Sequence, residues 1–262
     1  MSRHFARRRA AFAAMLAWLA MAPASTAGVP LPRSVAPADT GRALTRAEVL
    51  DRLSRSSDRS PADLSGADLS GLDLSGVDFK QANLTGARLV RTRLARAKMF
   101  GVTLSRAVAR EADFTGAVLD IAVMRQTDLT RATLREASLY ATILIGADLS
   151  DADLTGARVI AALTDAKLVR AKMAHANFGA DPGNQPMGVM FTNLADSDLS
   201  GADLTGANLR KASLVRANLS GATVGGADFT GANVAGTIMR DVRGREAIVG
   251  WNKARNVDQV VW

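Results

Sequence analysis

The stretch ADLSGADLSGLDLSGVDF, residues 62–79, repeats a unit of five residues, and this period decides the fold. The large apolar residue at the third position of each unit is called the centre here. All 34 centres but one are large apolar residues, the exception being an Ala, and the residue two before the centre is Ala in 25 units. Such regularity is typical of a repeat architecture. Centres recur every five residues from Leu64 to Val159, lie at Leu163, Leu168, Met173 and Phe178, and recur again from Leu194 to Met239.

A period of five fits neither an α-helix, with 3.6 residues per turn, nor a plain β-strand, with a period of two. The chain must therefore bend once per unit. Within a unit, strand alternation places the centre and the residue two before it on one side of the backbone, and the intervening Asp or Asn on the other. We expect Leu and Ala to fill a narrow core, in agreement with an aromatic content of only 5%.

The consensus A-[DN]-L-x-x, which extends over residues 62–241, resembles the signature of the pentapeptide-repeat family. The resemblance implies an all-β fold, a right-handed quadrilateral β-helix with four units per coil. The 34 units would then form about 8 to 9 coils. Short helical caps would close the two ends of the core.

The outward charges test this coil independently, because four units per coil would stack residues that are twenty apart in sequence. Opposite charges at cross-strand distance are favourable. The signs alternate along one column of unit ends, which, after a one-residue loss in the repeat, reads Arg91, Glu111, Arg131, Asp151 and Arg170. The cluster of basic residues from Arg88 to Lys98 is therefore interpreted mainly as charges paired along the stack. Arg96 and Arg106 have no acid in their own columns at the next coil, and we keep them as candidate partner contacts.

The first 27 residues have the layout of a secretory signal peptide. Arg3 and Arg7–Arg9 precede an apolar run at 10–21, which small residues follow. The run is too short to span a bilayer as a helix, and we expect no transmembrane segment in the mature chain. A periplasmic or secreted protein is predicted, with a cytoplasmic protein as the alternative. These residues carry four Arg and no acid, so their removal lowers the formal net charge from +8 to +4.

Residues 28–43 contain three prolines among small residues and read as a linker. A capping helix is predicted within 44–61, because Thr45 and Glu48 can form a capping box, and Leu44 and Val49 can form a hydrophobic staple.

The repeat breaks at residues 179–188, where turn-forming residues predict a loop. Asp181, Asn184 and Gln185 are candidate partner contacts there, since a loop on a regular rod favours recognition. The alternative is a tolerated insertion without a role. We expect the one-residue loss before Leu163 and a one-residue gain in this segment to cancel, with Val189 as the centre of an irregular unit.

Residues 242–262 are rich in large apolar groups and are predicted to form a C-terminal cap. Trp251 and Trp262 are kept as candidate partner residues, because two Trp so near the end of the chain leave a homodimer through this cap open.

No catalytic residue, cofactor or metal site is predicted. Cys is absent, which excludes disulfides and thiolate catalysis. His175 is the one histidine after residue 27. Its expected neighbour one coil on is Asp196, and we interpret the pair as a surface salt contact. The Asp and Asn before the centres are interpreted as turn formers rather than metal ligands.

Two functions remain. The first is an exported, non-enzymatic scaffold that binds a protein or an envelope component through its outer walls or loop. The second is a cytoplasmic DNA-mimicking protein that binds or protects a type II topoisomerase, as the family resemblance implies. A DNA mimic needs a strongly acidic surface, whereas this chain is basic with alternating signs. No concentrated basic stripe remains either, which argues against a nucleic-acid partner.

Overall fold

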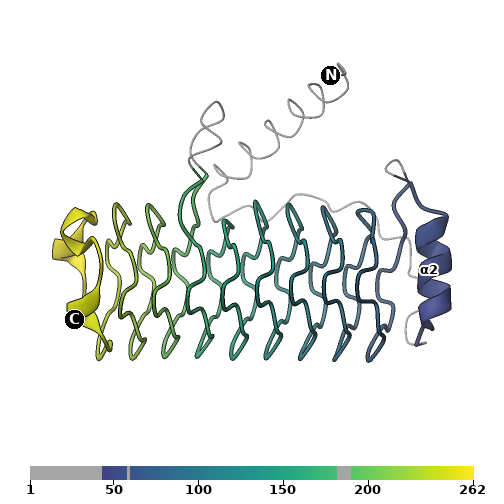
Figure 1. The fold of residues 1–262 in the computed structure, drawn as a ribbon, viewed down its shortest axis with the longest axis horizontal. Coiled ribbons are helices and arrows are strands. Elements are labelled where there is room, and N and C mark those ends of the chain that lie inside the picture. Colours follow the sequence, from purple (N-terminus) through teal and green to yellow (C-terminus); the bar gives the residue numbers. More distant parts are fainter. Residues whose placement is uncertain (1–42, 58–59, 182–189) are drawn as a thin grey trace, which may run out of the picture.

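Backbone bridges between residues twenty apart define the architecture. The computed structural model describes residues 43–57, 60–181 and 190–262, which build an elongated rod (Figure 1). Parallel bridges join each unit to the unit four positions further along the chain. The rod thus has four walls, made of isolated bridges rather than long strands. Walls 1 to 4 are numbered by the bridges with which the units begin, Asp63–Asn83, Asp68–Arg88, Asp73–Arg93 and Asp78–Lys98.

The core consists of the centres and the residues two before them, as the repeat predicts. Leu64, Leu84 and Leu104 stack on wall 1 and are 0% exposed. Burial of each such side chain contributes roughly 1.5 to 3 kcal/mol before the cost of ordering the chain. Where Thr replaces Ala inside the core, its hydroxyl is satisfied: Thr92 Oγ1 donates to the Leu69 carbonyl at 2.9 Å. The interior is therefore filled with side chains along its length.

The corner that ends a unit has a left-handed backbone in all described units except those centred on Val159 and Phe178. Glycine adopts this conformation at little cost, as at Gly66, with φ of 66°. Many corners instead carry Arg, Asp, Glu or Gln, such as Arg91, with φ of 55°. Ile121, also at φ of 55°, is a β-branched residue in a conformation that such residues rarely adopt.

Helix α2, Arg46–Ser54, lies at one end of the rod (Figure 1). The predicted capping box is confirmed: the Thr45 N–H donates to the Glu48 carboxylate at 2.7 Å, and the Glu48 N–H donates to the Thr45 hydroxyl. Val49 and Leu53 are buried in the same apolar cluster as the centres. The apolar side of α2 therefore packs onto the end of the core.

The break in the repeat differs from its expected form. The bridge from Ile143 to Ala162 spans nineteen residues, as the one-residue loss predicts, but the next bridge on wall 1 runs from Ala162 to Asn193. The unit at Asn193 on wall 1 thus follows the unit at Asn177 on wall 4 directly in the winding. Most of the predicted loop, residues 182–188, lies outside the described residues. The expectation of a one-residue gain was wrong. Val189 lies outside the described residues.

The C-terminal segment continues the walls with a longer period. Bridges reach Arg243, Val249, Arg255 and Val261, which are six residues apart. Three 3-10 helices turn the corners: η2 (Arg245–Ala247), η3 (Trp251–Lys253) and η4 (Val257–Gln259). The left-handed residues that precede these helices, Gly244, Gly250 and Asn256, are also six apart. The end of the rod is therefore covered by a wider turn of the same winding.

Candidate functional site: a partner surface on the outer walls

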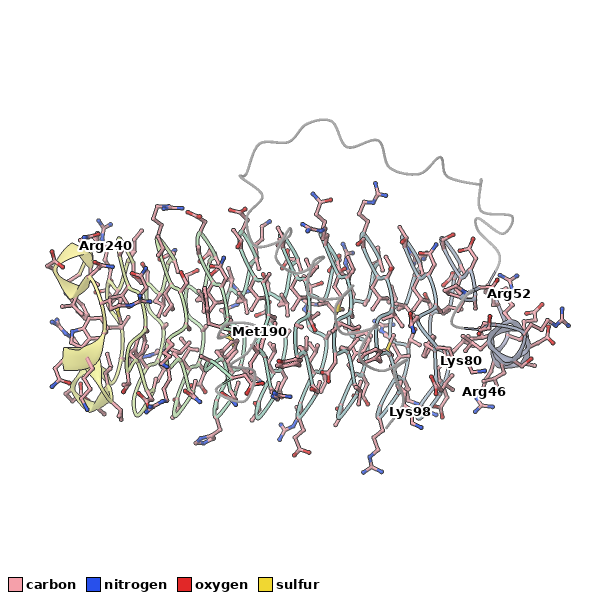
Figure 2. The ribbon with its side chains drawn as sticks, turned by 90° about the horizontal axis from the view of Figure 1, so that it is seen from above. Arg46, Arg52, Lys80, Lys98, Met190 and Arg240 are labelled. Atoms are coloured by element: carbon pink, nitrogen blue, oxygen red, sulfur yellow. The ribbon has the colours of Figure 1, made fainter. Side chains whose placement is uncertain are left out.

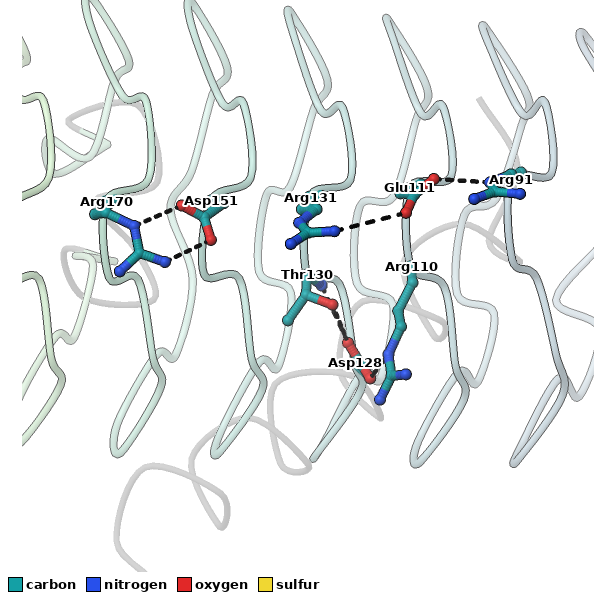
Figure 3. A network of polar contacts seen from close by, with 8 residues as sticks. All are labelled: Arg91, Arg110, Glu111, Asp128, Thr130, Arg131, Asp151 and Arg170. Atoms are coloured by element: carbon teal, nitrogen blue, oxygen red, sulfur yellow. Dashed lines mark hydrogen bonds and ion pairs between the residues drawn. The ribbon is translucent and has the colours of Figure 1, made fainter.

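The predicted column of alternating charges runs along the end of the wall 2 units (Figure 3). Arg91 Nε lies 2.7 Å from Glu111 Oε2, and Arg131 lies 4.0 Å from the same carboxylate. Arg170 binds both oxygens of Asp151, at 2.8 and 2.7 Å. These hydrogen bonds hold the pKa values of Glu111 and Asp151 below their ordinary values. The coil of twenty residues, which the resemblance implied and the charge pattern supported, is confirmed.

Wall 3 carries a further ion pair, between Arg93 and Asp73. The hydrogen bond from Arg93 holds the pKa of Asp73 well below its usual range. On wall 2, Arg88 lies 3.7 Å from Asp68. Within the basic cluster, Arg88 and Arg93 are thus paired with acids of the preceding coil, and Arg91 is paired with Glu111 of the next coil.

A diagonal set of ion pairs was not predicted. An Arg directly after one centre meets an Asp eighteen residues later, directly before the centre stacked upon it. The signal is a regular one and could have been found by testing separations near twenty as well as twenty itself. The three pairs are Arg110–Asp128, Arg135–Asp153 and Arg210–Asp228.

The carboxylates and amides before the centres act as turn formers, as predicted. Asp63 Oδ1 accepts the backbone N–H of Ser65 at 3.0 Å, and Asp128 accepts both the N–H and the hydroxyl of Thr130 (Figure 3). Within the part of the chain that the structure describes, no three His, Asp or Glu residues gather as a metal site would require. The same part contains no helix with the length and apolar character needed to cross a bilayer.

The structure does not bring Arg96 and Arg106 together. Arg96 ends a unit of wall 3, and its side chain lies next to Gly116. Arg106 ends a unit of wall 1, which is the opposite wall. Its backbone N–H donates to the backbone carbonyl of Arg125. Neither has an acid within ion-pair distance among the described residues. Each is an exposed cation on its own corner, and Figure 2 shows side chains projecting along the whole rod.

The expected contact between His175 and Asp196 was wrong. His175 stands beside Gly206, whose added Cβ would lie 2.7 Å from its Nδ1. Asp196 instead binds Arg216 through both oxygens, at 2.6 Å each. The expected contact assumed that 21 residues separate stacked positions here. The bridge from Lys172 to Asp203 spans 31 residues, so a different residue stacks on His175.

The base of the loop is held by side chains of the rod. Asp181 forms an antiparallel bridge with Met190, and its carboxylate lies 3.4 Å from Arg158. The Arg158 guanidinium carbon is 4.5 Å from the centre of the Tyr140 ring. The two remaining loop candidates, Asn184 and Gln185, lie outside the described residues.

The two C-terminal tryptophans have different environments. Trp251 packs edge-on against Phe229, with ring centres 5.6 Å apart, and is half-buried against the core. Trp262 packs on Trp251 at 5.5 Å, carries Arg245 over its ring at 3.5 Å, and is 41% exposed. Trp251 therefore contributes mainly to closing the rod, while Trp262 presents surface.

An outward-facing apolar region was not predicted, because its members come from separate units of the repeat. It lies where wall 4 meets wall 1, and we call it the apolar edge. Phe100 is 50% exposed and Val118 is 37% exposed. Ile121 packs over Gly101, with its Cδ1 3.6 Å from where a Cβ would stand. The apolar edge comprises Phe100, Val118, Ile121 and Val123.

Comparison with known proteins agrees with the repeat. The family described as pentapeptide repeats matches in 8 copies, over residues 62–99, 97–135, 134–160 and 190–226, which together exceed half of the chain. No curated protein matches.

Solved structures that resemble this one include HetL, a pentapeptide repeat protein involved in heterocyst differentiation regulation from the cyanobacterium Nostoc sp. strain PCC 7120. The identity is 25%, the match covers 80% of this chain and 94% of HetL, and the TM-score is 0.43. Full-length QnrB1, a plasmid-mediated fluoroquinolone resistance protein, is 17% identical over 70% of this chain and 92% of its own, with a TM-score of 0.34. At these TM-scores, nothing about the partners of this chain follows from the likenesses.

Proposed function

Because this chain belongs to the pentapeptide-repeat family, we propose that it is a non-enzymatic, exported scaffold that binds a protein or an envelope component through its outer walls. The observation that carries the proposal is the division of the rod into a filled interior and an ordered exterior. Centres are fully buried in unbroken stacks, so function falls to the outward side chains.

The filled interior favours binding over catalysis in this proposal. The hollow lined by Arg125, Gly146 and Asp165 is an open groove on the outside of the rod. Enzymes usually work in concave sites that bury most of a small ligand. A partner with an extended surface suits the long walls better.

Arg106 is the preferred contact on wall 1. Most arginines on neighbouring coils are neutralised by acids, whereas Arg106 is followed in its column by Gln126. An exposed cation without an internal partner is available to an acidic group of a partner. Arg96 is a second exposed cation of this kind, on wall 3. The two walls could therefore bind separate partners or one partner that wraps around the rod.

Export is proposed from the first 27 residues, which lie outside the described part. Cell fractionation and sequencing of the mature N-terminus test it. Recovery of the processed protein in the periplasm or medium supports export, and recovery of the uncut chain in the cytosol contradicts it.

The partner is tested by cross-linking in native cells, followed by identification of the captured protein. Arg106→Gln should reduce the capture several-fold. Arg216→Gln is the matched control, because Arg216 has the same corner position on wall 1 but is already paired with Asp196. Equal capture by both variants would exclude Arg106 as a contact, and capture of a type II topoisomerase would favour the DNA-mimic alternative.

A homodimer through the C-terminal turn is the assembly that the exposed apolar groups there support. Trp262 and Val261 are 41% and 39% exposed, and Val249 is 49% exposed. Light scattering at increasing concentration should give the mass of a dimer, and Trp262→Ser should shift it to the monomer. A monomer at all concentrations would contradict this assembly.

A further inference from the structure

A groove lies at the corner of walls 4 and 1, on the C-terminal side of the break in the repeat. Four residues line it, namely Phe191, Lys211, Gly231 and Arg255. Phe191, Lys211 and Gly231 lie on successive coils, each two residues before a bridging residue of wall 1, and Arg255 is the bridging residue of the next coil. The groove therefore runs along the axis of the rod, and we call it the basic groove.

The two cations of the basic groove have no acid within ion-pair distance among the described residues. Lys211 and Arg255 are both exposed, whereas Arg210, next to Lys211, already binds Asp228 at 3.1 Å. The wall 1 residues that bridge beside the groove carry no charge, and they are Asn193, Ser213 and Asn233. A ligand in the groove would thus meet positive charge that the protein itself does not neutralise.

Phe191 places an apolar surface at one end of the basic groove. Its side chain is 51% exposed, although phenylalanine is among the residues most often buried. Gly231 keeps the middle of the groove open, since a Cβ there would lie 3.4 Å from Cγ of Lys211. The groove therefore combines an exposed aromatic ring, an open floor and two unneutralised cations.

The side chains that line the basic groove select the chemistry of its ligand. Lysine and arginine only donate hydrogen bonds, and an ionised carboxylate only accepts them. Arginine can also bind both oxygens of one carboxylate. A sugar hydroxyl donates as well as accepts, and the side chains lining the groove offer it no acceptor. The complementary ligand carries carboxylates beside an apolar group, as an acidic peptide with an apolar side chain does.

The spacing of the two cations suits an extended chain better than a single small anion. Two coils separate Lys211 from Arg255. Coils are stacked about 4.8 Å apart, so the two residues lie roughly 10 Å apart along the rod. A polyproline II segment presents the same face every three residues, which corresponds to roughly 9 Å. Two acidic residues three apart in such a segment can therefore face both cations.

From these observations we infer that the basic groove binds an extended acidic peptide segment of a protein partner. An apolar side chain of the segment packs on Phe191, and two carboxylates three residues apart bind Lys211 and Arg255. The inference rests on the proposed function in one respect, namely that the partner of the rod is a protein. It adds the chemistry of the segment that the partner presents.

Fluorescence anisotropy with the purified protein tests the inference. The probe is a labelled peptide in which a leucine precedes two glutamates that are three residues apart, with prolines between them. Its affinity should fall as salt is raised, and Lys211→Gln and Arg255→Gln should each weaken binding by up to about five-fold. Arg240→Gln is the matched control, because Arg240 is an exposed cation of wall 2, away from the groove (Figure 2).

The aromatic contact has its own matched pair of variants. Phe191→Ser should weaken binding of the peptide several-fold. Phe100→Ser should leave it unchanged, because Phe100 is 50% exposed but lies on the apolar edge. All of these residues are exposed, so every variant should melt close to the unmodified protein.

Several results would overturn the inference. The first is no detectable binding of the peptide, and the second is an equal loss in Lys211→Gln, Arg255→Gln and Arg240→Gln, which would mean attraction to net charge alone. The third is equal binding of a peptide with glutamines in place of the glutamates. Tighter binding of an oligonucleotide or an acidic oligosaccharide of equal charge, through the same residues, would show that the occupant is not a peptide.

The peptide measurement and the cross-linking in cells fail separately. If the groove variants bind the peptide as the unmodified protein does, the groove is assigned wrongly, even where a protein is still captured in cells. If the peptide binds as expected and no protein is captured in cells, the groove has the inferred chemistry and the proposed function is wrong.

Discussion

The charged columns of walls 2 and 3 and the apolar edge between walls 4 and 1 share the same inner structure and have opposite exteriors. Leu129 and Leu119, centres on walls 2 and 4, are both 0% exposed. The residues beside them differ: Asp128 binds Arg110, whereas Val118 is 37% exposed to solvent. In this architecture the interior specifies the winding and leaves each outer wall free to carry a different surface.

The comparison also shows how a repeat protein combines order and variety. Backbone bridges and buried centres recur at every unit, so an outward substitution changes little of the fold. We therefore expect substitutions on either exterior to affect the stability of the core far less than substitutions of the centres.

The largest effect is expected inside. Leu119→Ala and Leu129→Ala should each lower the free energy of unfolding by about 2 to 5 kcal/mol, because each leaves a cavity in a filled core. Denaturant titration measures both. Val118→Ala is the control, because Val118 is the outward neighbour of Leu119. It should change the free energy of unfolding by less than about 0.5 kcal/mol. A marked difference between the two Leu variants would break the view that both regions have one common core.

Acid should weaken the charged walls selectively. The pKa values of Glu111, Asp151 and Asp73 are lowered in the folded protein, so the stability that they contribute is present above their unfolded values, 4.5 for Glu and 3.8 for Asp, and is lost as the pH falls through the folded values. The melting temperature should therefore decline below about pH 4.5.

Glu111→Gln provides the control for this decline. It should melt below the unmodified protein near neutral pH, and the difference should shrink in acid, where Glu111 is protonated. A difference that widened as the pH fell would contradict the assignment of the shift to the bond from Arg91.

Ile121→Asn should relieve backbone strain at the apolar edge. We expect a gain of up to about 1 kcal/mol in the free energy of unfolding, since Asn tolerates the left-handed conformation. Gln126→Asn is the control at a corner without a β-branched residue and should change stability less. Thermal unfolding compares them, and a loss of stability in Ile121→Asn would show that the isoleucine packs more strongly than its exposure indicates.

The smallest effects are expected for single charges on the columns, which lie in solvent. Arg170→Glu should lower the melting temperature by about 1 to 3 °C, because it removes two hydrogen bonds to Asp151. Arg131→Glu should cost less, since Arg131 lies 4.0 Å from Glu111. Arg96→Glu should cost nothing measurable, and equal losses in all three would mean that the pairing in the column is irrelevant.

Much of the fold could be predicted from local and periodic signals. The capping box at Thr45 involves residues three apart, and the charge column involves a constant separation of twenty. The errors share one cause. The neighbour of His175 and the phase of the unit at Asn193 depend on how many residues the loop takes out of the winding, which repeat counting alone does not decide.

Two further features were not predicted, the six-residue period near the C-terminus and the diagonal ion pairs. The six-residue period is visible in the sequence as the spacing of Gly244, Gly250 and Asn256. The apolar edge was missed for a different reason. Its members come from separate units and become neighbours only when walls 4 and 1 meet at a corner.

The sequence by itself determined the period, the inward set of Leu and Ala, and the bend at each fifth residue, because these follow from alternation along a short stretch of backbone. The tertiary structure alone decided which outward residues meet across coils, and hence where charges are balanced and where apolar groups lie exposed. The physical reason is that side-chain direction is local, whereas stacking depends on the length of every coil between two residues.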